Sequence, residues 1–451
     1  YSVQGLYNKS ERFLLRALAF REKTLEPNHY KIGELLNSLG VLYTRQGSHS
    51  KGESFYLRAI SIYKNTGKLN QSFLGNDLTY MYGKVIGNLG ANYLRQGLYS
   101  KAEPLLKRSL KIKEDQYGSE GLKVAGYLSN LGSLYSSKGL YSKAEPLLKR
   151  SLKISEINLD QNNREISYRL TNLANLYEDQ GLFHKAAKLL ERGLKIEFLF
   201  IQSETPYLAL SQRQSFLQSL GRDYESSFPF AFRENYGRKL ALFTRLNRQG
   251  LLEEIEKKQA KFSALLAGPQ QKIVEEIREI NRDLATNSLK DSRRQDLKKR
   301  KEELEKKLYR LLPEIKPRIV EVNQVAQAIP SNGFLIEYQR YQKFNSKKSD
   351  LEAWGEPLYL ALVLKPNGEI TSFDLGLASL IEEKIQQALK ASEEGLADAQ
   401  QLWREVGELV IKPLKESIGD AQTLFISPDA ELNRIPFAAL SSHKDNQLLG
   451  D

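Results

Sequence analysis

Residues able to perform covalent or metal chemistry are scarce in this chain of 451 residues. It contains no cysteine, which excludes disulfides, thiolate metal sites and a cysteine nucleophile supplied by these residues. The four histidines lack the spacing of metal ligands: His29, His49, His184 and His443. Neither a Gly-x-x-x-x-Gly-Lys phosphate loop nor a Gly-x-Ser-x-Gly nucleophile elbow occurs. We therefore expect no metal site, no cofactor and no catalytic residue here.

Side chains that could hydrogen-bond a ligand recur at fixed spacing instead. Asn88, Asn130 and Asn172 lie 42 residues apart, each followed by leucine and a small residue. Arg45 and Arg95 each stand two residues before a glycine, close to the same helix face, where Ser and Asp stand in later copies. Counted from those glycines, Asn37 is one residue out of register and Ser38 is the equivalent, so we leave Asn37 out of this set.

The elements that carry these residues form a repeat. Leu98–Ile112 and Leu140–Ile154 have the same fifteen letters, and weaker copies flank them. The glycines that open the copies have spacings of 42, 50, 42 and 42: Gly5, Gly47, Gly97, Gly139 and Gly181. The period is therefore 42 residues with one insertion of eight, which we place in a loop at Ser72–Leu78. Because the chain opens in the middle of a copy, we expect further sequence upstream.

Each copy predicts two helices. A leucine and a tyrosine four residues apart share one face of the first helix, with a small residue between them that allows close approach of a neighbour. The glycine should end this helix. Ser100 and Glu103 have capping-box spacing and should begin the second helix. Ala102, Leu106 and Ser109 then line one face of it.

With these features residues 1–200 resemble tetratricopeptide (TPR) repeats, in the long-helix variety found in kinesin light chains. The resemblance implies an α-solenoid whose first helices line a concave groove that binds a protein or peptide. In that family an asparagine of the first helix clamps the peptide backbone. This makes Asn88, Asn130, Asn172, Arg45 and Arg95 the candidate groove residues. The alternative is that the asparagines cap or pin neighbouring helices.

Charge divides the chain unevenly. Residues 330–451 carry 12 Lys and Arg against 19 Asp and Glu, so the remainder holds a net charge of +19 within the total of +12. A basic region of this size could attract nucleic acid or an acidic partner. The lysines alternate with glutamates on the second helices, however, which favours a solvated helix face. No apolar run is long enough to span a membrane, and the composition agrees with a cytoplasmic protein.

Beyond the repeats the pattern changes twice. Residues 201–268 still predict helices, with an aromatic stretch at 228–232 that we interpret as packing, and look like degenerate repeats closing the solenoid. Residues 269–318 contain two apolar seams of heptad spacing and predict a helical hairpin with a coiled-coil seam. This hairpin could be a lever, a docking arm or a spacer.

The last region, residues 319–451, predicts the start of an α/β domain. Strands are expected at 334–338, 358–364, 370–373 and 423–427, and helices at 377–392 and 398–418. Pro366-Asn367-Gly368 predicts a turn between the second and third strands. The fold class is therefore mainly α: a solenoid, a helical hairpin and then a partial α/β domain.

Leu424–Leu440, with its run Ser-Pro-Asp-Ala-Glu-Leu-Asn-Arg-Ile-Pro-Phe, resembles the signature of CHAT domains. These caspase-like domains are often joined to TPR arrays in bacteria, notably cyanobacteria. The resemblance implies a cysteine endopeptidase with a His-Cys dyad, but both dyad segments lie downstream of the signature in that family, and His443 does not match. Ala430 replaces a family glycine, so we expect a less unusual backbone there. Asp429 and Glu431 are expected to be solvated.

Three functional hypotheses follow. The chain could be the partner-binding or substrate-binding and regulatory portion of a TPR-CHAT caspase-like protease, whose catalytic half is absent from these residues. It could be a non-catalytic TPR interaction scaffold. It could also be a nucleic-acid-associated subunit that uses the basic region, in which case its affinity should fall steeply with salt.

Overall fold

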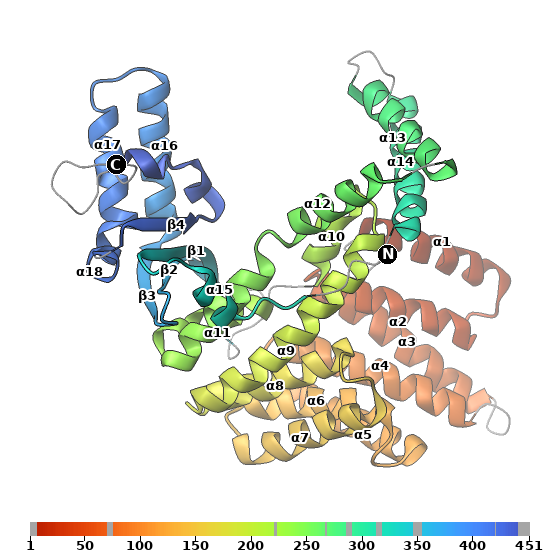
Figure 1. Ribbon diagram of the computed structural model, residues 1–451. Coiled ribbons are helices and arrows are strands. Elements are labelled where there is room, and N and C mark those ends of the chain that lie inside the picture. The colour runs from red at the N-terminus through yellow and green to blue at the C-terminus, as the bar shows by residue number, and fades with distance from the viewer. Residues whose placement is uncertain are drawn as a thin grey trace.

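The computed structural model describes residues 7–69, 75–220, 223–266, 268–285, 291–312, 318–345, 354–419 and 421–440. Its first part is a curved stack of paired helices, coloured red to yellow in Figure 1. The helices are α1 (Tyr7–Thr24), α2 (Tyr30–Arg45), α3 (His49–Leu69), α4 (Gly75–Arg95), α5 (Tyr99–Tyr117), α6 (Leu122–Ser137), α7 (Tyr141–Asn158), α8 (Arg164–Asp179) and α9 (Phe183–Glu204). The even-numbered helices α2 to α8 are the first helices of their repeats, which confirms the predicted two-helix unit.

Each first helix ends in the same turn. Gly97, just after α4, has a φ of +72°, a left-handed conformation that glycine adopts at little cost. Its N–H donates to the carbonyl of Leu94, and the N–H of Leu98 donates to the carbonyl of Tyr93. These are the two hydrogen bonds of a Schellman motif. The same pair occurs at Gly47, Gly139 and Gly181, which confirms that the periodic glycines end the first helices.

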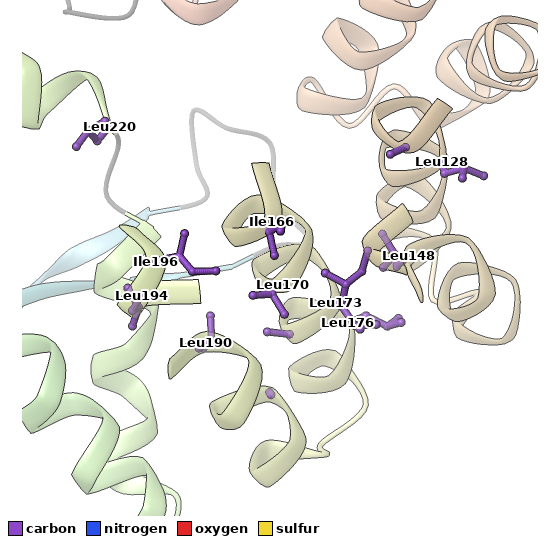
Figure 2. Packing of buried hydrophobic residues seen from close by; sticks show 14 of the residues in the cluster. Leu128, Leu148, Ile166, Leu170, Leu173, Leu176, Leu190, Leu194, Ile196 and Leu220 are labelled. Carbon is purple, nitrogen blue, oxygen red and sulfur yellow. The ribbon is translucent and has the colours of Figure 1, made fainter. Parts of the chain in front are cut away.

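Small residues let the two helices of a repeat approach closely. A Cβ added to Gly132 of α6 would stand 2.7 Å from the side chain of Leu148 on α7. The predicted face of α5 is also confirmed, because Ala102, Leu106 and Ser109 are all buried. Figure 2 shows how leucine and isoleucine side chains from α6 to α9 fill the space between successive helices. Every repeat therefore shares its core with its neighbours.

The predicted start of the second helix is wrong. α5 begins at Tyr99, and Leu98 at the N-cap makes no side-chain hydrogen bond. Glu103 pairs with Lys107 and Lys138 instead of closing a capping box. The reason is the Schellman turn, which joins directly to the next helix and leaves no extended residue at Ser100 whose hydroxyl could cap it.

The predicted insertion loop is also shorter than expected. Residues 70–74 lie outside the described residues, but α4 is already helical from Gly75. α4 has 21 residues, whereas the other first helices, α2, α6 and α8, have 16 each. Five of the additional residues therefore lengthen α4.

Short helices follow the repeats: η1 (Thr205–Tyr207), α10 (Leu210–Ser219), η2 (Asp223–Phe232), α11 (Asn235–Arg248) and α12 (Leu251–Ala264). The aromatic stretch lies in the 3-10 helix η2, where Phe228 and Phe230 are buried. The ring of Phe228 lies 5.9 Å from that of Tyr341, which belongs to the sheet described below. The stretch is packing, as predicted, and it packs between the solenoid and the sheet.

The predicted helical hairpin is present as α13 (Pro269–Ala285) and α14 (Asp291–Leu311). It has a small core of its own, formed by Ile273, Ile280, Leu297, Leu304 and Leu308. In Figure 1 it projects away from the sheet. Residues 286–290, between the two helices, and residues 313–317, after them, lie outside the described residues.

After α15 (Val322–Ala328), four strands form one sheet: β1 (Gly333–Phe344), β2 (Trp354–Leu364), β3 (Ile370–Leu377) and β4 (Thr423–Ser427). The order is β3-β2-β1-β4, and only the β1–β4 pair is parallel. Between β3 and β4 lie α16 (Ala378–Glu393), α17 (Ala399–Val410), η3 (Lys412–Leu414) and α18 (Lys415–Ile418), and after β4 come η4 (Ala430–Arg434) and η5 (Phe437–Ala439). All four predicted strands exist, but β1, β2 and β3 are longer than predicted. The helix expected at 398–418 breaks after Val410, because Pro413 cannot continue it.

The two faces of the sheet pack against different parts of the molecule. Side chains alternate along a strand, so Leu360 and Leu362 of β2 share a core with the solenoid. Tyr359 and Ala361 point the other way and pack with α16 and α17. The sheet is therefore a middle layer between the end of the solenoid and its own helices.

Candidate functional site

The three predicted asparagines occupy one position on α4, α6 and α8, and all are half-buried. Asn88 Nδ2 donates to Asn37 Oδ1 at 2.9 Å, and Asn172 Nδ2 donates to Ser129 Oγ at 2.7 Å. Each bond joins neighbouring first helices. Asn37 and Ser129 both stand ten residues before their turn glycine. The equivalent residue of α4 is Gly87, which has no side chain to accept a hydrogen bond from Asn130 of α6.

These bonds bear on both interpretations of the asparagines. They pin neighbouring helices, as the alternative interpretation expects. An amide side chain has two N–H donors and a carbonyl oxygen with two lone pairs, so one bond leaves capacity for a ligand. Asn37, which the repeat count excluded, takes part in the same set of hydrogen bonds. Each bond joins the residue nine before the turn glycine of one repeat to the residue ten before the turn glycine of the previous repeat.

The two predicted arginines lie on the first helices too, closer to the turns. Together with the asparagines they form a stripe across the repeats. Arg45 ends α2 and Arg95 ends α4, and both are exposed. Ser137 and Asp179 take the same position on α6 and α8. Burial raises the pKa of Glu178, beside Asp179, to about 7, and the charge of Asp179 adds to the rise. The position two residues before the turn glycine therefore carries a cation on α2 and α4 and the carboxylate of Asp179 on α8, while Glu178 is only partly ionised near pH 7.

A cavity of about 540 Å³ opens on the first helices of this stripe. Its lining joins three helices: Ser10, Phe13 and Leu14 from α1, Asn37, Ser38 and Val41 from α2, and Lys84 and Asn88 from α4. It offers an apolar wall, several amide and hydroxyl groups and one cation. Such a mixture suits a peptide side chain with its adjoining backbone.

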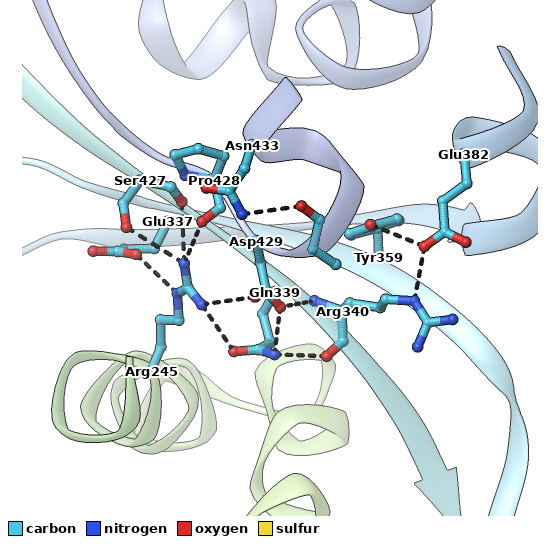
Figure 3. Close-up of polar contacts among 11 residues, drawn as sticks. Arg245, Glu337, Gln339, Arg340, Tyr359, Glu382, Ser427, Pro428, Asp429 and Asn433 are labelled. Carbon is cyan, nitrogen blue, oxygen red and sulfur yellow. Dashed lines mark hydrogen bonds and ion pairs between the residues drawn. The ribbon is translucent and has the colours of Figure 1, made fainter. Parts of the chain in front are cut away.

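A second polar centre, which sequence analysis missed, joins the solenoid to the sheet. Arg245 rises from α11 and is 1% exposed (Figure 3). Its Nε donates to Glu337 Oε2 at 2.9 Å, and its Nη2 donates to the carbonyl of Pro428 at 2.9 Å. Further bonds reach Gln339 and Ser427, and Nη1 lies 3.5 Å from Asp429 Oδ1. One guanidinium thus ties α11 to β1 and to the segment after β4.

The carboxylates around Arg245 depend on these contacts. Burial raises the pKa of Glu337, and the nearby guanidinium opposes that rise. Asp429 Oδ2 accepts from Gln339 Nε2 at 2.9 Å and from the N–H of Arg340 at 2.8 Å. The expectation that Asp429 is solvated is therefore wrong, because it holds the segment after β4 against β1.

The backbone at Ala430 also differs from expectation. Its φ is +49°, the left-handed region, and it is the only described residue other than glycine with a positive φ. Asn433 Nδ2 donates to its carbonyl at 3.0 Å. Alanine therefore adopts the backbone that glycine would take more readily, held by the contacts of its neighbours.

A sequence signal for Arg245 existed but was weak. It stands in the run Leu240-Ala241-Leu242-Phe243-Thr244-Arg245-Leu246, where a charge interrupts a buried helix. A buried charge requires a partner. Which partner cannot be inferred from spacing, because Glu337 and Asp429 lie about a hundred residues or more away in the chain.

Several lysines of the second helices pair with a glutamate one turn away. Pairs within 4 Å include Lys107–Glu103, Lys149–Glu145 and Lys195–Glu191. This pairing favours a solvated helix face over a nucleic-acid interface. In the described part of the chain, no three His, Asp or Glu side chains gather as metal ligands would. None of the helices described there has the length and apolar character needed to cross a membrane.

Comparison with known proteins identifies the repeats. Two tetratricopeptide repeat families match this chain, one over residues 1–65 and 82–157 and the other over residues 170–199. No curated protein matches. Among solved structures, BtubC (BKLC) from P. vanneervenii is 24% identical, with a TM-score of 0.35, over 42% of this chain and 73% of that one.

A second solved structure holds the nearly identical TPR-like repeats of a putative kinesin light chain from Podosopora anserina. It is 20% identical to this chain, with a TM-score of 0.34, and the match covers 44% of this chain and 90% of the Podosopora chain. The protein is therefore mainly helical, with an array of tetratricopeptide repeats in its first two hundred residues and a small sheet near its C-terminal part.

Proposed function

We propose that this protein binds an extended segment of a partner protein along the first helices of its repeats, α2, α4, α6 and α8. Tetratricopeptide repeats serve protein–protein interaction, and the array gives this chain that general role.

One observation carries the proposal. Positions two, six and nine before each turn glycine lie on one side of the first helices, and together they form a stripe that runs across the repeats. On α4 to α8 the stripe carries small or polar residues, such as Ala91, Ser133 and Asn175 at position six. These residues are half-buried and belong to no apolar cluster. Amides spaced along such a surface can pair with the N–H and C=O groups of an extended chain.

Charge gives the bound segment a direction. Arg45, Arg95 and Lys84 lie toward the N-terminal end of the stripe, and Asp179 lies at its far end. A partner segment with carboxylates at one end and cations at the other would meet opposite charges at both.

The test begins with peptides selected from a random library against the full chain. Replacing Asn88, Asn130 and Asn172 together by alanine should weaken their binding about 10- to 100-fold, since each lost hydrogen bond is worth about 0.5–1.5 kcal/mol. Fluorescence anisotropy measures the affinity. A control protein carries Asn158→Ala and Asn162→Ala, which lie at and beyond the end of α7 and away from the stripe. Equal affinity of triple variant and control would remove the groove assignment.

A second proposal concerns the C-terminal region, and the division of the chain into 1–200, 201–268, 269–318 and 319–451 belongs to it. We infer that the array is the regulatory portion of a TPR-CHAT caspase-like protease. The segment that resembles the CHAT signature supports this, because it begins in β4, a strand parallel to β1, and continues into the two short helices η4 and η5.

The catalytic part of that proposal lies outside these residues. The chain has no cysteine, so it supplies no thiolate nucleophile. Sequencing the source gene beyond the codon for Asp451 tests the inference. A His-Gly segment and a Ser-Ala-Cys segment downstream would support a protease. Their absence there would leave the interaction scaffold.

A further inference from the structure

The helical hairpin α13–α14 is attached to the rest of the molecule in a different way from the sheet. The sheet shares an apolar core with the solenoid, through residues such as Leu360 and Leu362. The hairpin has a separate core, and among the described residues none of the solenoid side chains belongs to it. The hydrophobic effect therefore contributes little to holding the hairpin against the solenoid.

The base of the hairpin contacts α10 through polar groups. Glu305 Oε2 of α14 accepts a hydrogen bond from the N–H of Leu210 at 3.0 Å. Glu302 Oε1 accepts from the hydroxyl of Ser211 at 2.7 Å, and its Oε2 accepts from Gln212 Nε2 at 3.4 Å. Leu210 begins α10, so its N–H has no acceptor within that helix, and Glu305 supplies one. We call these three hydrogen bonds the latch.

A buried arginine lies beside the latch. Arg213 of α10 is 1% exposed, and its guanidinium lies 5.0 Å from the ring centroid of Tyr309 on α14. Its Nη2 donates to Gln259 of α12, but its Nη1 is buried and makes no hydrogen bond to a described residue. A buried donor without a partner costs free energy. Departure of the Tyr309 ring would let water reach this guanidinium.

Docking of the hairpin also buries a carboxylate. Glu305 is 2% exposed, and this burial raises its pKa, while the N–H of Leu210 and the charges of Lys301 and Arg213 oppose the rise. Water would solvate both Glu305 and Arg213 if the hairpin moved away. Because polar contacts are then exchanged for contacts with water, the latch contributes little net stability. We therefore expect the docked and released positions to be close in free energy.

The connection from α12 to α13 has the features of a hinge. Gly268 has a φ of +65°, and a Cβ built on it would meet no heavy atom within 4 Å. Pro269 follows at once and begins α13. Glycine in open surroundings can change its backbone angles without a clash, while the helices on either side keep their shape.

We propose that the hairpin is a movable arm, which turns about Gly268 and is held against α10 by the latch. In the docked position, the carboxylates of Glu302 and Glu305 occupy hydrogen-bond donors at the start of α10. Release of the arm uncovers these donors and the guanidinium of Arg213. The hairpin is then a lever and not a spacer. This proposal does not depend on the asparagine stripe, because the motion is measured without a partner.

Spin labels on the full chain test the motion. Because the chain has no cysteine, two introduced cysteines carry the only labels, at the exposed positions Arg282 of α13 and Lys188 of α9. Pulsed electron paramagnetic resonance then measures the distance between the arm and the solenoid. The labelled parent should show two distances, one for each position of the arm.

Variants of the latch should change the populations of the two positions. Glu305→Lys should lower the ratio of docked to released arm at least about tenfold, because it removes a charge-assisted hydrogen bond and places a cation near Arg213. Glu303→Lys makes the same charge change at an exposed position of α14 and is the matched control, which should leave the ratio unchanged. Thermal melting checks that each variant folds.

A milder variant keeps the test valid if Glu305→Lys does not fold. Ser211→Ala combined with Gln212→Ala removes both partners of Glu302 and should lower the ratio at least about fivefold. A single distance that no latch variant changes would make the hairpin a rigid spacer and overturn the proposal. Two distances whose ratio responds equally to Glu303→Lys and to the latch variants would also overturn it, because the latch would not control the arm.

Discussion

The repeat array and the junction around Arg245 are held together in opposite ways. In the array, each helix packs on the next along the chain, and the same leucines, glycines and tyrosines return every 42 residues. At the junction, α11, β1 and the segment after β4 meet through one buried guanidinium, and its partners are 92 to 184 residues away. The array repeats one set of local contacts, whereas the contacts of the junction occur once and join distant segments.

This difference has an energetic consequence. Stability in a repeat array is spread over many similar contacts, so a single change acts on one interface. A single substitution in a buried ion pair causes a larger loss of folding stability, because removing one partner leaves the other charge buried alone. The following four predictions test this contrast, from the largest expected effect to the smallest.

Arg245→Met should lower the free energy of unfolding by about 3–5 kcal/mol, because the Glu337 carboxylate loses its partner while buried. Urea denaturation measures the loss. Arg58→Met is the control, since Arg58 pairs with Glu22 at the surface of the array and should cost no more than about 1 kcal/mol. The double variant Arg245→Met with Glu337→Gln should recover part of the stability. Equal losses for Arg58→Met and Arg245→Met would contradict the contrast.

Lys113 is a buried cation inside the array that does not recur in the next repeat, where Ser155 takes its position. Burial lowers its pKa to about 7, with help from the charges of Lys84 and Lys123, and its Nζ lies 3.3 Å from the ring centroid of Tyr80. The unfolded chain therefore binds the proton more tightly, and stability should rise from pH 7 toward pH 10. Lys113→Met should stabilise the protein by about 2 kcal/mol at pH 6.5 and by much less at pH 9.5, after an allowance for partial solvation. A gain that is equal at both pH values would refute this.

Two glycines of α6 separate close packing from helix propensity. Gly132→Ala should destabilise the array by about 1–3 kcal/mol, because the new methyl group would stand 2.7 Å from Leu148. Gly126→Ala, in the same helix, meets only Arg169 at 3.6 Å and should stabilise it by up to about 1 kcal/mol. Thermal denaturation of the two variants compares them directly. The same sign for both would mean that the helices of this repeat are not closely packed at Gly132.

The smallest change in stability is expected for Ala430, which lies in the segment after β4 at the junction. Ala430→Gly should be neutral or stabilise by up to about 1 kcal/mol, since glycine adopts a positive φ without the alanine penalty. Ala260→Gly, in the exposed interior of α12, should destabilise by about 1 kcal/mol. Chemical denaturation resolves the difference in sign. A loss at Ala430 as large as that at Ala260 would argue against the left-handed backbone.

Local and periodic features account for what the sequence could predict. The glycines after α2, α4, α6 and α8 end those helices because glycine alone takes the left-handed turn cheaply, and this signal is contained within a few residues. The capping box at Ser100 failed because two local signals competed and the Schellman turn won. The strands of the sheet were found, but β1, β2 and β3 were predicted too short because the missed ends carry polar residues.

The site residues show the same limit. Repeat counting placed Asn88, Asn130 and Asn172 on one stripe, but it excluded Asn37, whose contact with Asn88 depends on how two first helices are offset. Arg245 and Asp429 could not be paired from the sequence, because no spacing rule links residues 184 positions apart. Contacts between distant segments require the fold before they can be seen.

Site-directed photo-crosslinking would test most directly the claim that the first helices of the array bind a partner segment. A photoreactive phenylalanine derivative replaces Ser133, on the stripe of α6, or Lys149, on the outer face of α7. A library-selected peptide should crosslink to the protein labelled at position 133 and not to the one labelled at position 149. Crosslinking from position 149 alone would place the partner on the other face and contradict the account.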